Sequence, residues 1–378
     1  MQNFHLLYLC KWYPNKKDIQ NGNFLQKQAK HLSKKIKVSS IFLLALPEQQ
    51  KTEIVVSESQ NLLEIIIYYK NYKNPILKFY FFLKYWLAAF KIAEEKLGKA
   101  NALQVNVLPL LIIPAYFHSL KRNIPIYVSE HWSGFINGNF ENLNWFQKAL
   151  YNWGFRKAKH IFVVSETLKK GISQFYNNDL KIKVIPNIIQ FIEPNLKNKF
   201  DKKSPNILVI ADLVDEVKNI SGIIKSVNNF NENNFSLNII GAGKDEKKLS
   251  ELIEQLGLEN QIKMLGVLSS KEVLKHYNES DFIVINSNYE TFSMVAAEAI
   301  AHGKPVICTK CGGPEEFINE RNGILIPVND EIALQLALNE MIENYSRYNS
   351  EKMMEEIRLK FDSEKTILQL LNYINQEI

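Results

Sequence analysis

Two glutamates, Glu290 and Glu298, lie close together in the run NYETFSMVAAEAIAHGKPVI. The preceding segment DFIVINS (281–287) is apolar enough for a strand covered on both faces of a parallel sheet. From Ser293 onward, small and apolar residues recur at near-helical spacing until Gly303, a residue typical of a helix end. We therefore expect Glu290 in a turn and Glu298 about one to two turns inside a helix.

The start of this helix is predicted to bind an anion. Its first free backbone N–H groups, at residues 292–295, point out of the helix end, where about half a positive charge attracts phosphate. Two carboxylates beside a phosphate would repel it unless each accepts hydrogen bonds from hydroxyls. A sugar nucleotide offers ribose hydroxyls for one glutamate and sugar hydroxyls for the other. The alternative, an exposed helix residue and a plain turn residue, stays open.

Length and composition bound the class of protein. The chain has 378 residues, more than the roughly 250 to 300 at which a single core stops growing, so we expect two domains. It is 46% hydrophobic and 23% charged, and no stretch reaches the roughly 18 apolar residues of a membrane span. The first residues, MQNFHLLYLCKWYP, resemble a first strand and not a signal peptide. The expected location is the cytoplasm.

Cysteine usage and charge exclude two further classes. Cys308 and Cys311 form a Cys-x-x-Cys pair, but Cys10 is the only other cysteine, so a four-thiolate zinc site cannot form. We interpret the pair as a strand end running into a glycine turn. The formal charge of +6 is spread without the clustered basic stripe of a nucleic-acid-binding protein. That charge favours an anionic membrane face or a phosphate-bearing substrate.

Strands and helices alternate on both sides of a polar stretch at 188–204, which we interpret as a linker. This pattern predicts an α/β protein with two facing doubly wound Rossmann-like domains, residues 1–187 and 205–361, and a ligand cleft between them. A C-terminal helix at about 362–378 is expected to pack on the first domain. The predicted strands are HLLYLC, VSSIFLLAL, NALQVNVL, PIYVSE, HIFVVSE, NILVI, SLNIIG, IKMLG, DFIVIN and PVICT; the predicted helices include 23–33, 74–97 and 145–158.

Several other residues follow predicted strands, where ligands bind. Gly241 and Gly243 form an incomplete dinucleotide-binding turn, and Lys218 could place its ammonium on a diphosphate. His131 lies beyond the strand PIYVSE, and Gly22 precedes the first helix, where it would let backbone approach a ligand closely. A solvated lysine, a structural histidine and ordinary tight turns remain the alternatives.

Several of these features follow one another along the chain: Gly22, His131 in SEHWSGF, VIPN, Lys218-Asn219, IIGAG, Glu290 with Glu298, and GKPVI. In this order of features, the chain resembles the retaining glycosyltransferases of family four, group 1. These enzymes have two Rossmann domains, the GT-B fold. The resemblance spans nearly the whole chain and is strongest at ETFSMVAAEAIAHGKPVICTKCGGPEE. It implies a hexosyltransferase that moves a sugar from a nucleoside-diphosphate sugar to a glycan or lipid-linked acceptor, in surface polysaccharide or glycoconjugate assembly.

The resemblance also implies roles for the residues that match. Glu290 would contact hydroxyls of the transferred sugar, and Glu298 would accept from the ribose. Donor oxygens would bind the backbone near the helix start, at Phe292, Ser293, Met294 and Val295, with further donor contacts at Gly241 and Leu268.

Three other matching residues would complete the site. Lys218 would neutralise the departing diphosphate, His131 would hydrogen-bond the sugar, and Gly22 would let the first loop close over the donor. No metal or other cofactor is expected, because lysine and helix terminus replace it. One departure stands out, since Asp212 occupies a position where many members have an arginine; Lys244 could substitute for that cation.

The resemblance implies same-face attack, with a donor phosphate oxygen taking the acceptor's proton. The acceptor itself is undetermined. The aromatic segment PILKFYFFLKYWLAAFKI (75–92) could lie on an anionic membrane interface or simply cover the sheet of the first domain. Two other functions stay open: a sugar-nucleotide epimerase of the same fold, and a catalytically silent sugar-nucleotide-binding subunit.

Overall fold

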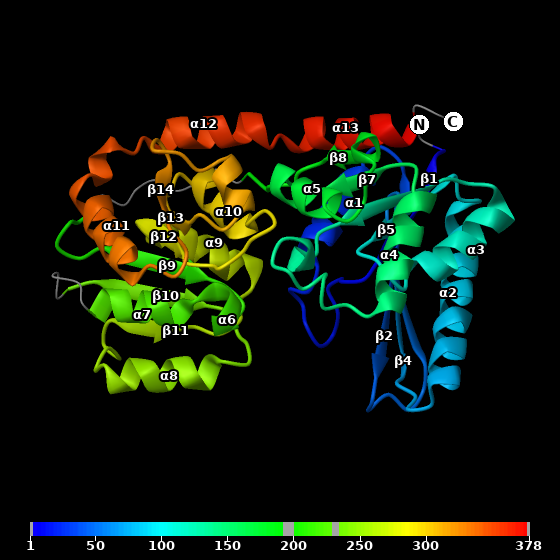
Figure 1. Cartoon of the computed structure of the whole chain (residues 1–378), viewed down its shortest axis with the longest axis horizontal. Helices are drawn as coiled ribbons and strands as arrows, with labels where there is room; N and C mark the ends of the chain where they lie inside the picture. Colours follow the sequence, from blue (N-terminus) through cyan, green and yellow to red (C-terminus); the bar gives the residue numbers. More distant parts are fainter. Residues whose placement is uncertain (1–2, 192–199, 229–233, 376–378) are drawn as a thin grey trace. The chain divides into compact units, whose positions relative to one another are not determined.

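The structure is a computed structural model that describes residues 3–191, 200–228 and 234–375. The chain forms two compact units: Met1–Ile188 with Ser363–Ile378, called unit 1 here, and Ile189–Asp362, called unit 2 (Figure 1). The predicted linker at 188–204 lies in large part outside the described residues. No helix in the described part of the chain combines the length and apolar character that a membrane crossing requires.

Unit 1 is built on an eight-stranded sheet in the order β3-β4-β2-β1-β5-β6-β7-β8. All neighbouring strands are parallel except β3 and β4, which form an antiparallel hairpin at one edge. The strands are β1 (His5–Cys10), β2 (Lys37–Leu46), β3 (Glu53–Ser59), β4 (Leu62–Lys70), β5 (Ala102–Asn106), β6 (Ile126–Glu130), β7 (Ile161–Val163) and β8 (Ile182–Val184). The helices are α1 (Asn23–Leu32), α2 (Pro75–Leu97), α3 (Ile112–Arg122), α4 (Trp145–Lys157), α5 (Glu166–Ser173) and α13 (Ser363–Asn375).

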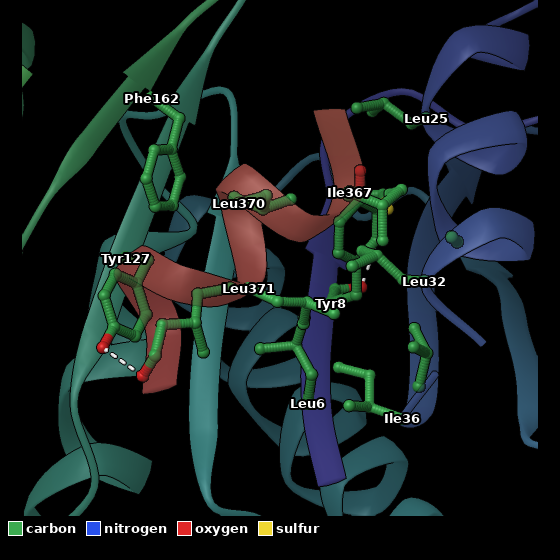
Figure 2. Packing of buried hydrophobic residues seen from close by; sticks show 14 of the residues in the cluster. Leu6, Tyr8, Leu25, Leu32, Ile36, Tyr127, Phe162, Ile367, Leu370 and Leu371 are labelled. Atoms are coloured by element: carbon green, nitrogen blue, oxygen red, sulfur yellow. Dashed lines mark hydrogen bonds between the residues drawn. The ribbon is translucent and has the colours of Figure 1, made fainter. Parts of the chain in front are cut away.

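The C-terminal helix α13 packs into unit 1 although the whole of unit 2, Ile189–Asp362, separates it in sequence from the rest of that unit. Ile367, Leu370 and Leu371 of α13 are buried in one cluster with Leu6 and Tyr8 of β1 (Figure 2). The hydroxyl of Tyr127 on β6 donates to the carbonyl of Ile374 at 3.1 Å. Apolar burial of about 25 cal/mol per Å² makes this contact a major stabilising element of the unit.

Unit 2 has a six-stranded parallel sheet in the order β11-β10-β9-β12-β13-β14. The strands are β9 (Asn206–Ile210), β10 (Ser236–Ile240), β11 (Ile262–Met264), β12 (Phe282–Ile285), β13 (Val306–Thr309) and β14 (Gly323–Ile326). The helices are α6 (Asp215–Lys218), α7 (Ile220–Asn228), α8 (Glu246–Gln255), α9 (Ser270–Glu279), α10 (Met294–Ala301), α11 (Glu331–Glu343) and α12 (Ser350–Lys360). Strand order reverses between β9 and β12, where such sheets bind ligands.

Both units have the doubly wound α/β fold that the sequence predicts. All ten predicted strands are present, with differences at their ends, whereas the β3–β4 hairpin, β8 and β14 were not among the predicted strands. The predicted strand at 281–287 is too long, because β12 ends at Ile285 and Asn286 and Asn288 turn away to hydrogen-bond the backbone around α6. The predicted strand NALQVNVL is also too long, because Val107 has φ 66° and leaves the sheet after Asn106.

Candidate functional site

The turn after β12 carries Glu290 and is fixed to the loop after β13. Glu290 forms an isolated parallel bridge with Gly312: its N–H donates to Cys311 O at 2.8 Å, and its carbonyl accepts from Gly313 N at 2.9 Å. A Cβ on Gly313 would lie 2.4 Å from the carbonyl oxygen of Thr291, so only glycine allows this close approach. The backbone around Glu290 is therefore held on both sides.

Lys218 and Glu290 form an ion pair, with Nζ 2.6 Å from Oε1. Ser287 Oγ also donates to that carboxylate at 2.8 Å. Burial disfavours the Lys218 ammonium, but the nearby carboxylates, first Glu290 and then Asp212, outweigh burial and raise its pKa. Two predicted site residues that lie far apart in sequence are thus brought together, with Lys218 charged.

Helix α10 begins directly beyond Glu290 and leaves its first N–H groups available. Its N-cap residue, Ser293, has left-handed backbone angles (φ 67°, ψ 85°), and its side chain makes no capping hydrogen bond. The N–H groups at Met294 and Val295 therefore lack the intrahelical partners of later residues. Phe292 anchors the helix start, because its ring packs against Phe317 and Phe361 at centroid distances of 5.7 and 5.1 Å.

Glu298 lies in the second turn of α10 and is half-buried. Burial raises the pKa of Tyr277 on α9, and the Glu298 carboxylate raises it further, which places the two side chains close together. The Tyr277 hydroxyl donates to Val295 O at 3.4 Å. Glu298 therefore lies one turn from the helix start that the ion pair adjoins.

The glycine turn after β10 packs on its own protein backbone. Gly241 has φ 141°, and a Cβ there would lie 1.9 Å from the carbonyl oxygen of Ala211; one on Gly243 would lie 2.4 Å from Leu213 O. These glycines are required because the turn rests on the loop that leads to Lys218. Leu268 is half-buried in the loop between β11 and α9. Contacts of Gly241 and Leu268 with a donor stay predictions.

Unit 1 places His131 at the carboxyl end of β6, beside the start of α1. The imidazole is 7% exposed, with Nε2 3.0 Å from Ser129 Oγ and its ring 4.8 Å from the ring of Phe24. Burial lowers the pKa of His131 to about 3, so the ring is neutral at pH 7. Its Nδ1 atom has no hydrogen-bond partner among the described residues.

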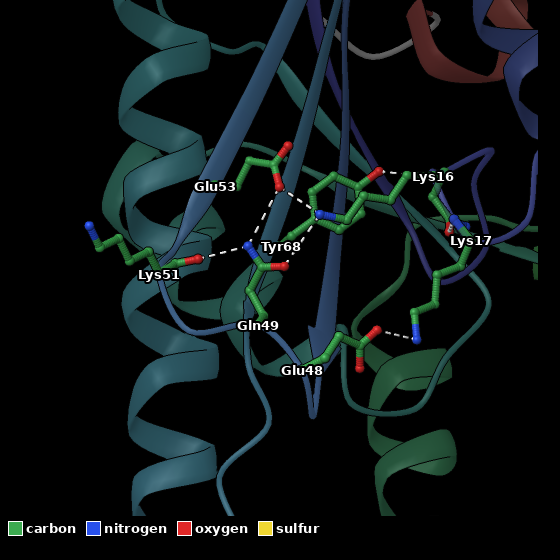
Figure 3. Close-up of polar contacts among 8 residues, drawn as sticks. Lys16, Lys17, Glu48, Gln49, Lys51, Glu53 and Tyr68 are labelled. Atoms are coloured by element: carbon green, nitrogen blue, oxygen red, sulfur yellow. Dashed lines mark hydrogen bonds and ion pairs between the residues drawn. The ribbon is translucent and has the colours of Figure 1, made fainter.

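Gly22 is the N-cap of α1 and has φ 64°. A Cβ there would lie 2.5 Å from the carbonyl carbon and oxygen of Trp12, so only glycine permits the loop to fold back this closely. Exposed polar contacts hold the same loop against β3 and β4 (Figure 3): Lys16 Nζ to Glu53 at 2.6 Å and to Gln49 at 3.3 Å, Lys16 over the Tyr68 ring at 4.1 Å, and Lys17 to Glu48. Exposed ion pairs contribute little stability each, so the buried Tyr13, whose hydroxyl donates to Glu64 at 2.6 Å, is the stronger anchor of this loop.

Asp212 and Lys244, the residues at the departure from the family pattern, lie near the ion pair. Asp212 is exposed and adds negative charge near Lys218. Lys244 is 62% exposed and pairs at 3.7 Å with Glu216 of α6, which precedes Lys218 by two residues. Both side chains can move, so they tune the local charge without fixing it.

Sequence reasoning missed Glu130, which precedes His131. Its carboxyl is fully buried and accepts from Leu108 N at 2.8 Å. Burial raises the pKa of Glu130 to about 8 although backbone N–H groups oppose the shift. A glutamate that ends an apolar strand was the available signal. Cys308 and Cys311 are buried thiols, and the described residues contain no cluster of side chains suited to a metal ion.

Two doubly wound α/β units, one of them with a lysine–glutamate pair beside a helix start, suit a nucleotide-binding transferase with two Rossmann-like domains. Residues 27–190 match the model of Glycosyltransferase Family 4, and residues 192–359 match that of Glycosyl transferases group 1. Together these matches cover nearly the whole chain. The chain belongs to the family 4, group 1 glycosyltransferases.

Similar proteins agree with this assignment. An uncharacterized glycosyltransferase of Methanocaldococcus jannaschii is 31% identical over 46% of this chain and 48% of its own length. The N-acetylgalactosamine-N,N'-diacetylbacillosaminyl-diphospho-undecaprenol 4-alpha-N-acetylgalactosaminyltransferase of Campylobacter jejuni is 27% identical over 64% of this chain and 66% of its own length. The chain spans about half the length of the first curated relatives that it matches. The structure of Anabaena HepE with UDP and glucose has the same fold, with TM-score 0.74, 16% identity and coverage of 99% of this chain and 100% of that chain.

Proposed function

We propose that this protein transfers a sugar from a nucleoside-diphosphate sugar to a hydroxyl of a glycan or lipid-linked acceptor, with retained anomeric configuration. The observation that carries the proposal is the Lys218–Glu290 ion pair next to the free start of α10. A charged ammonium and unpaired N–H groups suit a diphosphate. The Glu290 carboxylate, which lies near both the ammonium and the helix start, suits the hydroxyls of the sugar attached to that diphosphate.

The ion pair also explains how two partly buried charges are tolerated before a donor binds. Without donor, Glu290 neutralises Lys218 at 2.6 Å. A bound diphosphate would attract the ammonium and free the carboxylate to accept from sugar hydroxyls. Both charges would then have partners in the free and the bound protein, which avoids an unpaired, partly buried ion.

Charge balance supports a metal-independent reaction. As the bond between the anomeric carbon and the phosphate oxygen breaks, negative charge grows on the leaving diphosphate, where Lys218 and the start of α10 would stabilise it. The acceptor oxygen would bond to the same face of the anomeric carbon, and its proton would pass to a leaving phosphate oxygen. Asp212 opposes this stabilisation, and Lys244, which pairs with Glu216 of α6, could offset it.

His131 suits the recognition of an uncharged sugar. It is neutral, its Nδ1 is free among the described residues, and Gly22 and Phe24 lie at the adjacent helix start. A neutral imidazole can donate or accept one hydrogen bond without adding charge near the diphosphate. Its contact with the sugar is part of the proposal.

The names of similar proteins support the substrate classes. One neighbour of the same fold binds UDP and glucose, and one relative is named for transfer to a diphospho-undecaprenol acceptor. For this protein we propose only the substrate classes that these names indicate: a nucleoside-diphosphate hexose as donor, and a glycan or lipid-linked acceptor.

The first turns of α2 fit a membrane-bound acceptor. This helix follows β4, so its start lies at the carboxyl edge of the sheet, the edge that also carries Gly22 and His131. Large apolar side chains are exposed at the starts of α2, α3 and α4: Ile76, Leu77, Phe79, Tyr80, Leu110, Trp145 and Phe146. Lys73, Lys78 and Lys84 are also exposed there. Apolar and basic groups together suit the surface of an anionic bilayer, and we propose the inner face of the membrane as the working location.

Incubation of the protein with a panel of nucleotide sugars, in EDTA and without acceptor, tests this function. The proposal expects slow hydrolysis of one donor, with NMR at early times showing the released sugar in the donor's anomeric configuration. Conversion of the donor into its epimer would favour an isomerase. Donor binding without any turnover, even when lipid extracts are added, would favour a silent binding subunit.

A further inference from the structure

Helix α6, which carries Lys218, is a single turn of four residues, Asp215–Lys218. Such a turn is not stable alone, because helix nucleation is unfavourable and the last carbonyls have no intrahelical donors. Its C-cap residue, Asn219, has φ 45°, which stops the helix there. The position of the Lys218 side chain therefore depends on what else holds these carbonyls.

The segment immediately after β12 supplies the missing donors. Asn288 donates twice, from its backbone N–H to Val217 O and from its side-chain amide to Glu216 O, both at 2.8 Å. The buried amide of Asn286 donates to Asn219 O at 3.0 Å. These three hydrogen bonds thus take the place of those that a following helical turn would make to the carbonyls at the end of α6.

The same segment also holds Glu290. Ser287, between the two asparagines, donates from Oγ to Glu290 Oε1 at 2.8 Å. Thr309 of β13 in turn donates to the Ser287 carbonyl. Residues 286–288 consequently fix the lysine through its backbone and the glutamate through its carboxylate.

Helix α7 leaves space for this arrangement at Gly222. A Cβ on Gly222 would lie 2.8 Å from both Asn219 Oδ1 and Asn286 Nδ2. The glycine keeps these two amide side chains in place, since any larger residue would push on both. Gly222 is therefore a packing requirement of the same cluster.

We propose that Asn286 and Asn288 are positioning residues that set Lys218 and Glu290 at ion-pairing distance and so prepare the site for the donor diphosphate. This inference rests on the proposed function, in which Lys218 binds that diphosphate. Neither asparagine needs to touch the substrate, because both act through the α6 backbone.

The test uses Asn288→Ala, Asn286→Ala and Lys218→Ala, with Asn238→Ala as matched control. Asn238 donates its amide to Asn206 Oδ1 at 3.1 Å in the same sheet. Dissociation constants for UDP, GDP, ADP and dTDP are measured by calorimetry, together with melting temperatures. We expect Asn288→Ala to weaken the tightest of these diphosphates about tenfold, as loss of a hydrogen bond that orders a charged group should. The control should stay within about twofold of the wild type.

A purely structural role would lower the melting temperature of Asn288→Ala and leave its affinity unchanged, which would overturn the proposal. A crystal structure of Asn288→Ala provides a readout that needs no ligand. We expect Lys218 Nζ to move beyond ion-pairing distance of Glu290; an unchanged pair would also overturn the proposal. If the wild type and Lys218→Ala bind every diphosphate equally, the proposed function fails, while the structure of the variant still decides the role of Asn288. Should Asn286→Ala not fold, Asn288→Ala alone carries the test, because Asn288 is only half-buried.

Discussion

At the carboxyl end of β6 the polar side chains are buried and uncharged, whereas at the carboxyl end of β12 they are ionised and paired. Burial lowers the pKa of His131 to about 3 and raises the pKa of Glu130 to about 8, so both are mainly neutral at pH 7. Around β12, Lys218 and Glu290 lie 2.6 Å apart, and the pKa of Lys218 is raised, not lowered.

The difference follows from what each position provides. His131 and Glu130 have few compensating groups, so the cost of burying a charge decides their protonation. Lys218 is only half-buried, and a carboxylate at contact distance offsets the cost of that burial. A region that keeps charges can bind a charged diphosphate, and one that suppresses them can bind neutral hydroxyls.

Replacement of Glu290 should have the largest effect on activity. Glu290→Ala removes the carboxylate proposed to contact the sugar and leaves Lys218 without its main partner. We expect kcat to fall by about 10² to 10³, the range for loss of one electrostatic contact in a transition state. Turnover close to the wild type, with an intact circular dichroism spectrum, would remove Glu290 from the mechanism. Glu320→Ala, which removes an exposed carboxylate in the turn before β14, is the control.

Replacement of Lys218 should come next. Lys218→Met keeps the length of the side chain and removes its charge, so the diphosphate loses one charge-assisted contact. We expect the donor KM to rise about thirtyfold, which corresponds to about 2 kcal/mol. Lys247→Met is the matched control, because Lys247 is a 90% exposed lysine of α8 that pairs with Glu251. An equal loss in both variants would mean that overall charge, and not the position of Lys218, matters.

The raised pKa of Glu130 predicts that the stability of unit 1 depends on pH. Its folded pKa of about 8 exceeds the ordinary value of 4.5, so its favourable contribution is complete below pH 4.5 and is lost as pH rises through 8. Glu130→Gln mimics the protonated carboxyl and should remove that loss, with a gain on the order of 4 kcal/mol relative to the wild type at pH 8. Melting temperatures of the wild type and Glu130→Gln at pH 5 and pH 8 measure this difference in stability. A parallel pH response in both proteins would contradict a protonated Glu130; exposed Glu141→Gln is the control.

The exposed start of α2 should affect membrane binding but hardly stability. The double change Phe79→Ser and Tyr80→Ser removes two exposed rings, so we expect an unchanged melting temperature and reduced flotation with vesicles of anionic phospholipid. Leu87→Ser is the matched control, because Leu87 is equally exposed but lies further along the same helix. Equal flotation of all variants, or none by the wild type, would leave α2 as a cover of the sheet.

The sequence was most informative where local pattern alone decides structure. Four apolar residues in succession predicted β12, and the small residues after Ser293 predicted α10. The β3–β4 hairpin was not predicted, because every residue of β3 is exposed and no buried face marks that strand in the sequence. Strand ends were also unpredictable where side chains such as that of Asn288 bond a distant loop.

For the candidate site, residue types were predictable and partners were not. Motif resemblance selected Lys218 and Glu290 separately, but no spacing rule states that they form an ion pair across 72 residues. Gly241 was selected for close approach to a ligand, whereas its turn closely approaches Ala211. Burial decided the protonation of Glu130 and His131, and burial depends on the packing of the whole unit.

The most direct test of the central claim is calorimetric titration of nucleotide sugars, in EDTA, into the wild type and Lys218→Met. The claim that the Lys218–Glu290 pair forms the donor site predicts that one nucleotide sugar binds the wild type and binds Lys218→Met at least about tenfold more weakly. Equal affinities in the two proteins, or no binding of any nucleotide sugar to the wild type, would contradict it.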